Sequence, residues 1–375
     1  MRVAVLTNGP GELWGWARPV IMELRRRGHS VSLWLLPCQY ASGYERTAAS
    51  SLGVDKLEGP NGPVRTWFAL GQEKTDCVLQ LGGDLAFGQR MAKRSDAPLI
   101  CYAYAWKKGM EHAKVFTAYS SMAAAINSVL GQPFALTVGD LVKDSLALER
   151  ETLKWEDVGS EKASARLLLF PGSRPSIRRM TLGWLIEFVR NLKGLAPDIR
   201  VGTLFPPFVP ESEFFAWREA GLCPLKTGAG TAMRVADYAL TQPGTNTLEL
   251  MHCGLPALVV APLDFLKVAP TGGLFGYLFG FPGLGPALKE WKIRRNLERY
   301  SGFVAWPNRI AGRMVMDEAL GDVKPKGVAI RVTSALRDRE RLARIRAELL
   351  NLSGESGAVT RLCDAVDQGA GVAEL

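Results

Sequence analysis

Residues 2–36 read RVAVLTNGPGELWGWARPVIMELRRRGHSVSLWLL, and they decide the fold class. The run Val3–Thr7 is short, apolar and rich in strand-forming residues, and the turn residues Asn8–Gly11 follow it. An amphipathic stretch then extends to Arg27, and a second apolar run occupies Val31–Leu36. This order of strand, loop, helix and strand predicts a βαβ unit at the start of an α/β protein.

The same alternation continues along the chain in two series. In the first series, strands are expected at 77–81 and 99–104, with a basic helix between them. The polar segment 149–165 then interrupts the apolar pattern, which is typical of an interdomain connection. The second series has expected strands at 166–170, 201–205, 238–241 and 257–261, an expected helix at 182–192, and charged helical sequence from about 326.

The length of the chain indicates more than one domain. Its 375 residues exceed the roughly 250–300 residues at which a single core stops growing. The 47% of apolar residues can fill two cores, and the 22% of charged residues argue against extended disorder. We therefore expect an N-terminal α/β domain at 1–155, a second at 156–330, and C-terminal helices at 331–375 that pack across both.

The charge of the chain narrows the classes of partner. A formal net charge of +9 and a pI of about 9.3 favour phosphates, nucleic acid or anionic lipid headgroups. Nucleic acid is not expected as a partner, because the sequence lacks a helix-turn-helix pattern and lacks basic residues interleaved with stacking aromatic residues.

The cysteines and the hydropathy indicate the compartment. No two cysteines form a CxxC pair, so neither a zinc site nor a disulfide framework is expected. Reduced, mostly buried thiols are typical of a cytoplasmic protein. The N-terminus lacks a signal-peptide pattern, and no apolar run reaches the ~20 residues of a membrane span. A soluble or peripheral protein is expected. The cysteines are Cys38, Cys77, Cys101, Cys223, Cys253 and Cys363.

Three expected strand-to-helix loops carry residues suited to a ligand, because the carboxyl ends of parallel strands open into a crevice. The first is Phe170–Arg174. In it, Gly172 and Ser173 allow a close approach of the backbone to a phosphate, and Arg174 can grip that phosphate with two hydrogen bonds. An ordinary strand-ending turn with a solvated arginine remains the alternative.

The second loop is Thr241–Glu249. Gly244, together with the side chains of Thr245, Asn246 and Thr247, can surround a diphosphate, and Glu249 is placed to accept hydrogen bonds from ribose hydroxyls. The alternative is a helix cap whose carboxylate closes a capping box.

The third loop is Asn8–Glu12, directly after the first strand. It lacks the full GxGxxG pattern of dinucleotide-binding proteins, so a nicotinamide cofactor is not expected. Glu12 is a candidate polar contact to an acceptor substrate. The alternative is that Glu12 only caps the following helix.

Three ordered segments of the second half resemble signature segments of one enzyme family. They are LLFPGSR at 168–174, PGTNTLE at 243–249 with CGLPALVV at 253–260, and WPNRIAGR at 306–313. In this order they resemble the lipid-A-disaccharide synthase family. The resemblance implies the GT-B fold, in which two Rossmann-like domains flank an interdomain cleft. It also implies transfer of an acylated glucosamine from UDP to an acylated glucosamine phosphate, with inversion and without a metal or other cofactor.

The resemblance assigns roles to residues of this chain. Arg174 and the loop Thr245–Thr247 would hold the pyrophosphate, Glu249 the ribose, and Asn308 would line the donor site. The domain at 1–155 would then face the acceptor, and the domain at 156–330 would bind the UDP-sugar. Partners would be the UDP-sugar and a lipid-linked acceptor.

The N-terminal half departs from the family's pattern. The first loop reads GELWGW at 11–16, without the serine and aspartate that the family carries there. The strand that normally ends in the catalytic aspartate is followed here by LGGDLAFG at 81–88, with its carboxylate displaced by about two positions. Asp84 is nevertheless the first candidate for the general base, and Glu12 the second, because a carboxylate at a strand end can take the proton of the acceptor hydroxyl.

An apolar stretch in the second half suggests a membrane surface. Residues 263–291 are rich in Gly and Phe, and Lys292, Arg294, Arg295 and Arg299 follow them. An apolar segment followed by basic residues is typical of a membrane-surface contact, because the basic side chains are attracted to anionic lipid headgroups. A buried contact between domains or between copies of the chain remains the alternative, so an oligomer is possible.

Two other functions remain open from the sequence. A UDP-N-acetylglucosamine 2-epimerase has a similar two-domain architecture, and the strand end at 82–84 would suit it. A non-catalytic nucleotide-sugar binding protein is the third reading. The segment around Pro307-Asn308 and the apolar stretch favour the transferase. We therefore expect a cytoplasmic hexosyltransferase of lipid A biosynthesis, peripheral at the inner face of the cytoplasmic membrane.

Overall fold

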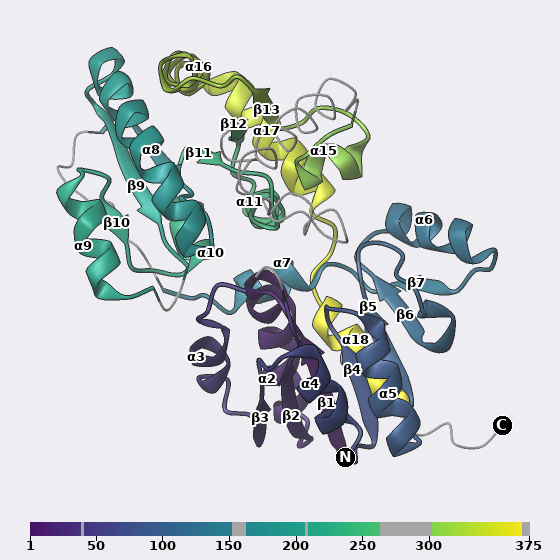
Figure 1. The fold of residues 1–375 in the computed structure, drawn as a ribbon. Helices are drawn as coiled ribbons and strands as arrows, with labels where there is room; N and C mark the ends of the chain where they lie inside the picture. The colour runs from purple at the N-terminus through teal and green to yellow at the C-terminus, as the bar shows by residue number, and fades with distance from the viewer. Residues whose placement is uncertain (39–40, 152–162, 207–208, 263–301, 370–375) are drawn as a thin grey trace, which may run out of the picture. The chain divides into compact units, whose positions relative to one another are not determined.

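The computed structural model describes residues 1–38, 41–151, 163–206, 209–262 and 302–369 (Figure 1). The chain divides into two compact units. The first comprises Met1–Leu148 and Gly354–Leu375, and the second comprises Glu149–Ser353. The apolar stretch at 263–291 and the basic residues up to Arg299 lie outside the described residues.

The described strands of the first unit form one parallel sheet in the order β3-β2-β1-β4-β5-β6-β7. In chain order the strands are β1 (Arg2–Thr7), β2 (Ser30–Leu35), β3 (Lys56–Glu58), β4 (Cys77–Gln80), β5 (Leu99–Tyr102), β6 (Lys114–Thr117) and β7 (Ala135–Thr137). The helices are α1 (Pro10–Glu12), η1 (Leu13–Ala17), α2 (Arg18–Arg26), α3 (Glu45–Ser50), α4 (Pro63–Leu70), α5 (Leu85–Ser95), η2 (Met110–His112), α6 (Ser120–Leu130), α7 (Leu141–Ala147) and α18 (Ala358–Gly369).

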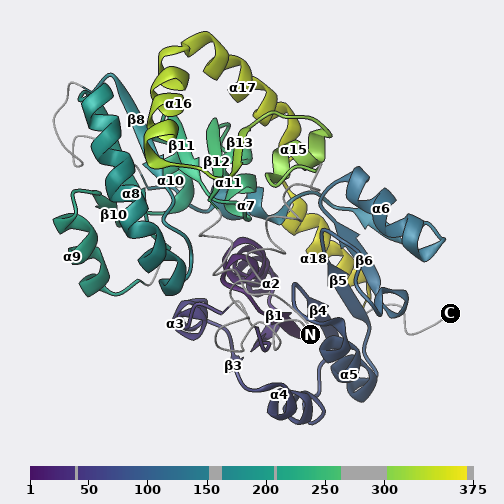
Figure 2. The same cartoon turned by 45° about the horizontal axis from the view of Figure 1, so that its top comes forward.

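The second unit repeats this arrangement, with described strands in the order β10-β9-β8-β11-β12-β13, all parallel (Figure 2). The strands are β8 (Ala165–Leu169), β9 (Ile199–Leu204), β10 (Pro224–Leu225), β11 (Tyr238–Thr241), β12 (Ala257–Pro262) and β13 (Asp317–Gly321). The helices are α8 (Pro175–Leu195), α9 (Glu211–Glu219), α10 (Ala229–Val235), α11 (Asn246–His252), α15 (Trp306–Ala311), α16 (Pro325–Arg337) and α17 (Arg339–Leu352).

The apolar runs form strands because both of their faces are buried under helices, which is the usual reason for continuous apolar strands in a parallel sheet. The central strands β1 and β4 are almost inaccessible to solvent, and Leu6 and Val78 join the core cluster of the first unit. In the second unit, Leu167 and Leu169 on β8 pack with Phe188 on α8. The expected strands of both series are confirmed, and the fold class is α/β with two Rossmann-like sheets.

Two features differ from the expectations. The helix after β1 is not regular, because the five residues of η1 form a π-helix between α1 and α2. The expected group of helices at 331–375 is divided, since α16 and α17 belong to the second unit and α18 returns to the first. The boundary between the units lies at 148/149, within the same connection that contains the predicted boundary at 155.

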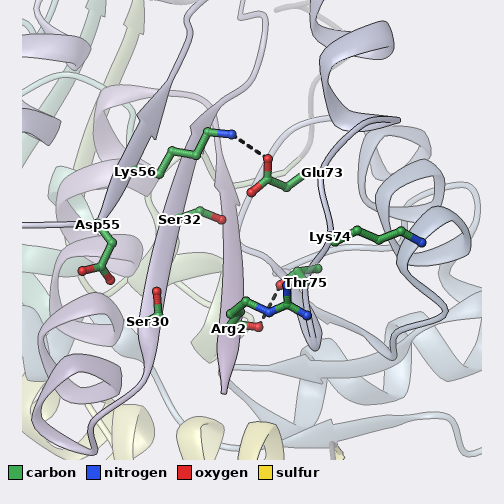
Figure 3. Close-up of a pocket in the computed structure, with 8 residues that line it drawn as sticks. All are labelled: Arg2, Ser30, Ser32, Asp55, Lys56, Glu73, Lys74 and Thr75. Carbon is green, nitrogen blue, oxygen red and sulfur yellow. Dashed lines mark hydrogen bonds and ion pairs between the residues drawn. The ribbon is translucent and has the colours of Figure 1, made fainter.

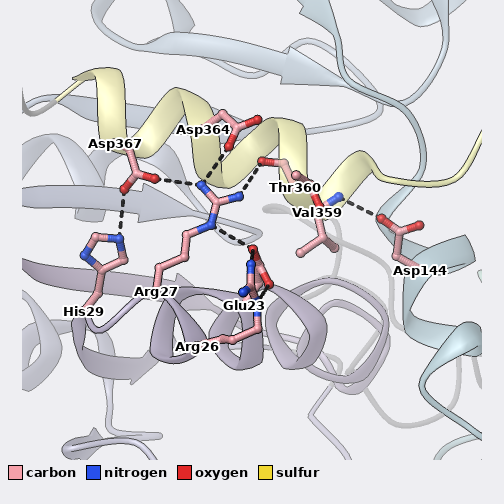
Figure 4. A network of polar contacts seen from close by, with 9 residues as sticks. All are labelled: Glu23, Arg26, Arg27, His29, Asp144, Val359, Thr360, Asp364 and Asp367. Atoms are coloured by element: carbon pink, nitrogen blue, oxygen red, sulfur yellow. Dashed lines mark hydrogen bonds and ion pairs between the residues drawn. The ribbon is translucent and has the colours of Figure 1, made fainter.

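A polar network fixes α18 to the first unit (Figure 4). The Arg27 guanidinium, at the end of α2, forms ion pairs with Asp364 and Asp367 of α18 at 2.7 Å each. It also forms an ion pair with Glu23 of α2 at 2.8 Å. Hydrogen bonds from Arg26, and then from Arg27, lower the pKa of Glu23 to about 2 although partial burial opposes this change. The carboxylate of Glu23 is therefore ionised and stabilising at neutral pH.

This network predicts a pH-dependent stability. Replacing Glu23 with Gln should lower the free energy of unfolding by roughly 1–3 kcal/mol at neutral pH. A carboxyl whose pKa is depressed in the folded state stabilises the protein above its unfolded pKa and loses this effect as the pH falls towards the folded pKa. The difference between wild type and Glu23→Gln should therefore shrink as the pH falls from about 5 towards 2.

Thermal unfolding of both proteins across this pH range measures the difference. Glu340→Gln is the control, because the Glu340 side chain is 93% exposed and its contact with Arg344 is 4.0 Å long. If the difference in unfolding free energy between wild type and Glu23→Gln stays constant with pH, Glu23 does not have a lowered pKa in the folded protein.

Candidate functional site

Two predicted loops of the second unit lie where the strand order of its sheet reverses. Starting from β8, the chain adds β9 and β10 on one side and β11, β12 and β13 on the other. At such a reversal the loops after the two central strands separate and leave a crevice at the carboxyl edge. The loops here are Phe170–Arg174 after β8 and Gln242–Thr247 after β11. The Phe170 amide donates to the Leu240 carbonyl at 3.0 Å, which keeps the two loops side by side.

The loop at 170–174 is held by Arg178, which the sequence pattern did not single out. Arg178 lies one turn into α8, and its side chain is fully buried. It donates to the Ser173 carbonyl at 2.8 Å and to both carboxylate oxygens of Glu213 at 2.5 and 2.9 Å. Gly172 has a φ of +104°, and a Cβ there would come within 2.5 Å of Ile177. The loop therefore has a fixed shape, with Ser173 exposed and Arg174 half-buried at the start of α8.

The loop at 242–247 separates into ligand-accessible and structural parts. Gly244 is exposed, and Thr245, Asn246 and Glu249 are half-buried. Thr247 is different, because its side chain is buried. Its hydroxyl donates to the Gly244 carbonyl at 2.8 Å and accepts from the backbone amide of Trp306. The expectation that Thr247 contacts a pyrophosphate is corrected, since its hydroxyl is occupied in shaping the turn.

Asn308 also has a structural position. Its side chain is fully buried in α15, and its amide oxygen accepts from the backbone of Val315 and Met316 at 2.7 and 2.8 Å. Its nitrogen donates to the Met316 carbonyl at 2.8 Å and to Glu318 at 2.7 Å. Asn308 therefore does not line a ligand site directly, because all four hydrogen-bonding positions of its amide group are occupied.

The interactions of Asn308 nevertheless support the loop after β11. Glu318 accepts from the amide of Ala305 at 2.9 Å, and this contact holds the start of α15. The next amide, of Trp306, donates to the Thr247 hydroxyl at 3.1 Å. Asn308 and Glu318 thus fix α15, and α15 in turn fixes the turn at 244–247.

The first unit has the same reversal between β1 and β4, and it places the two candidate bases there. Glu12 follows β1, and Asp84 follows β4. Asp84 is exposed and caps α5, because its Oδ1 accepts from the Ala86 amide at 3.0 Å. Glu12 is half-buried, and its side chain lies against Gly9 and Gly82. Both carboxylates therefore stand at the carboxyl edge of the sheet.

The loop after β4 is shaped by a buried glutamine. The Gln80 amide donates to the carbonyls of Gly82 at 2.9 Å and Asp84 at 2.8 Å. Gly82 has a φ of +147°, and a Cβ there would lie 2.6 Å from the Asn8 side-chain oxygen. Only glycine fits this position, which brings the loops after β1 and β4 into direct contact.

A second polar cluster at the same edge was not predicted. Tyr104 follows β5, Tyr119 follows β6 and Asp140 follows β7. The Tyr104 hydroxyl donates to Asp140 at 2.6 Å and accepts from the Trp16 indole at 3.2 Å. The Tyr119 hydroxyl contacts Asp140 at 3.3 Å, and burial together with this carboxylate raises the pKa of Tyr119. This cluster anchors the π-helix η1 rather than presenting free groups.

A cavity of about 100 Å³ lies at the opposite edge of the first sheet (Figure 3). Its lining includes the first residues of β1 and β2, at the amino ends of the strands. Two of its cations are already neutralised by neighbouring carboxylates, since Lys56 contacts Glu73 at 2.6 Å and Arg2 contacts Asp76 at 2.7 Å. This cavity is therefore no candidate for the site.

The thiols and the helices of the described residues add two findings. The cysteines form no disulfide there, and burial raises the pKa values of Cys77, Cys253 and Cys363 to about 12 and that of Cys101 to about 11. Such thiols are unreactive.

Among the described helices, none combines the length and the apolar character that crossing a membrane requires.

Comparison with known proteins supports the family resemblance in the second half. Residues 136–269 match the family model described as lipid-A-disaccharide synthetase. Lipid-A-disaccharide synthase of Myxococcus xanthus is 26% identical over 218 residues, which cover 56% of this chain and 51% of that protein. The enzyme of the same name from Trichlorobacter lovleyi is 23% identical over 312 residues, covering 76% and 72%. The chain thus spans about half the length of the first of these relatives.

Solved structures share the fold of the whole chain. The UDP-GlcNAc 2-epimerase from Neisseria meningitidis bound to UDP-GlcNAc has a TM-score of 0.58 at 13% identity, with 98% of this chain and 100% of that chain covered. The glycosyltransferase VinC in complex with DTDP has a TM-score of 0.52 at 12% identity, covering 99% and 100%. These likenesses establish the GT-B fold and do not separate transferase from isomerase. The resemblance to the lipid-A-disaccharide synthase family is confirmed over residues 136–269, and this match supports a glycosyltransferase.

Proposed function

We propose that this chain is an inverting glycosyltransferase that moves an acylated glucosamine from a UDP-sugar to a lipid-linked sugar acceptor. The observation that carries the proposal is the position of the family's motifs at the strand-order reversal of the second sheet. There, LLFPGSR and PGTNTLE contain the loops that follow β8 and β11, within the region that matches the lipid-A-disaccharide synthetase model. The proposed donor is therefore a nucleoside diphosphate sugar.

In this proposal the second unit binds the donor. Arg174, at the start of the 21-residue helix α8, and the backbone amides of Gly172 and Ser173 would hold the diphosphate, because amides and a guanidinium both attract phosphate oxygens. Gly244, Thr245 and Asn246 would contact it from the other loop. Glu249, half-buried on α11, would accept hydrogen bonds from the ribose.

The first unit would bind the acceptor and supply the base. The acceptor hydroxyl oxygen attacks the anomeric carbon, the bond from that carbon to UDP breaks, and UDP leaves with the electron pair. The hydroxyl proton passes to Asp84, or to Glu12 if Asp84 only caps α5. No metal or cofactor takes part in this scheme. A lipid-linked acceptor would place the protein at the inner face of the cytoplasmic membrane as a peripheral protein.

The donor assignment predicts the effect of two substitutions. Arg174→Ala and Glu249→Ala should each weaken UDP binding by roughly 1.5–3 kcal/mol, because each removes a hydrogen bond to or from a charged group. Arg190→Ala and Glu187→Ala are the controls, since both residues are exposed on α8. Titration calorimetry with UDP measures all four, and unchanged affinity in both site variants would remove the donor site from these loops.

The base assignment predicts a loss of rate without a loss of binding. Asp84→Asn should lower turnover by about 10²- to 10⁴-fold and leave UDP affinity unchanged. Asn caps a helix about as well as Asp, so α5 should remain intact. Asp96→Asn is the control on the same helix, because Asp96 is exposed at its other end. Near-normal single-turnover rates for Asp84→Asn would move the base to Glu12, which Glu12→Gln then tests.

Product analysis separates the three functions. The protein is incubated with UDP-N-acetylglucosamine and with UDP-diacylglucosamine, each with and without a lipid-linked glucosamine acceptor, and the products are identified by mass spectrometry and NMR. The proposed transferase should release UDP and form a disaccharide only when the acceptor is present. A 2-epimer formed without acceptor would identify an isomerase, and binding without any product would identify a carrier.

A further inference from the structure

A largely buried ion pair lies behind the loop that follows β8. The Arg178 side chain of α8 is inaccessible to solvent, and the Glu213 side chain of α9 is only 22% exposed. Two hydrogen bonds, of 2.5 and 2.9 Å, join the guanidinium to both carboxylate oxygens. The Phe205 ring, directly after β9, lies beside them, with its centre 5.9 Å from the guanidinium carbon. Because a buried guanidinium needs a counter-charge, Glu213 is what allows Arg178 to stay in this position.

Arg178 and a neighbouring threonine bind three consecutive carbonyls of the loop. Arg178 donates to the Ser173 carbonyl at 2.8 Å and, more weakly, to the Gly172 carbonyl at 3.4 Å. Thr181, which is buried on the next turn of α8, donates to the Pro171 carbonyl at 2.8 Å. All three carbonyls are therefore turned towards α8.

The orientation of these carbonyls sets the orientation of the amides. In a planar trans peptide the N–H points away from the C=O of the same peptide unit. The amides of Gly172, Ser173 and Arg174 share peptide units with the three carbonyls, so they point away from the buried guanidinium. Consecutive amides that point to one side of a loop are suited to an anion such as a phosphate.

We propose that Glu213 is a positioning residue of the donor site, because through Arg178 it turns the amides at 172–174 towards the donor diphosphate. Its carboxylate would not touch the donor itself, since Arg178 engages both of its oxygens. The inference rests on the proposed function, in which the loop at 170–174 binds the diphosphate.

Titrations of the full-length protein with UDP and with uridine, followed by NMR, test the proposal. Uridine lacks the diphosphate, so the orientation of the loop amides should not affect its binding. Glu213→Gln keeps the size of the side chain and removes its charge. It should weaken UDP binding by about 10- to 100-fold, the range of one or two hydrogen bonds to a charged group, and leave uridine binding within about twofold of wild type. An equal loss for both ligands would overturn the proposal.

A second variant separates the orientation of the loop from the stability of the unit. In Arg178→Met/Glu213→Leu, apolar side chains replace the ion pair, an exchange that leaves the stability of many proteins unchanged or higher. This variant should keep the melting temperature of wild type and still bind UDP about 10- to 100-fold more weakly, because no guanidinium then draws the carbonyls at 172 and 173 towards α8. Wild-type UDP affinity in this variant would overturn the proposal.

Glu211→Gln is the matched control. Glu211 lies on the same helix and also forms an ion pair, with Lys226 at 3.2 Å, but its side chain is 69% exposed. This variant should bind UDP as wild type does, because an exposed ion pair contributes little.

Arg174→Ala separates this inference from the proposed function. If Arg174→Ala weakens UDP binding and both Glu213 variants bind UDP normally, the positioning role is wrong and the donor site stands. If UDP binds normally to all three variants, the diphosphate does not use this loop, and the donor site fails together with the inference.

Discussion

Both sheets share one constraint, because the strand order in each unit reverses beside its first strand. In the first unit the reversal separates the loops after β1 and β4, and in the second it separates those after β8 and β11. Backbone groups at these carboxyl ends have left the ladder of the sheet, so they are available to a ligand. Every loop that the sequence singled out for chemistry follows one of these four strands.

The loops keep their shape because buried polar side chains use their hydrogen bonds on the loop backbone. Gln80 does this in the first unit and Arg178 in the second, whereas Asn308 supports the turn at 244–247 indirectly, through Glu318 and α15. Leaving such a buried group unpaired would cost about 1–3 kcal/mol, so each of them strongly favours one loop conformation. Rigid loops lower the entropy cost of binding, which would favour the diphosphate of the proposed donor.

The sequence predicted the central strands and the loops that follow them, but not the polar side chains that support these loops. Strands such as β11 matched their predicted bounds because long apolar runs have no other stable environment in an α/β protein. The edge strands β3, β7 and β10 are two or three residues long and carry too little periodicity to be recognised. The structural role of Thr247 was not predictable either, because its partner Trp306 lies 59 positions away in the sequence. Arg178 offered one signal, its spacing of one turn after Arg174.

A crystal structure of the protein with UDP would show directly where the donor binds. We expect the diphosphate between the loops at 170–174 and 242–247, with Arg174 on its oxygens and Glu249 on the ribose hydroxyls. UDP bound in the first unit, or at a distance from both of these loops, would contradict it.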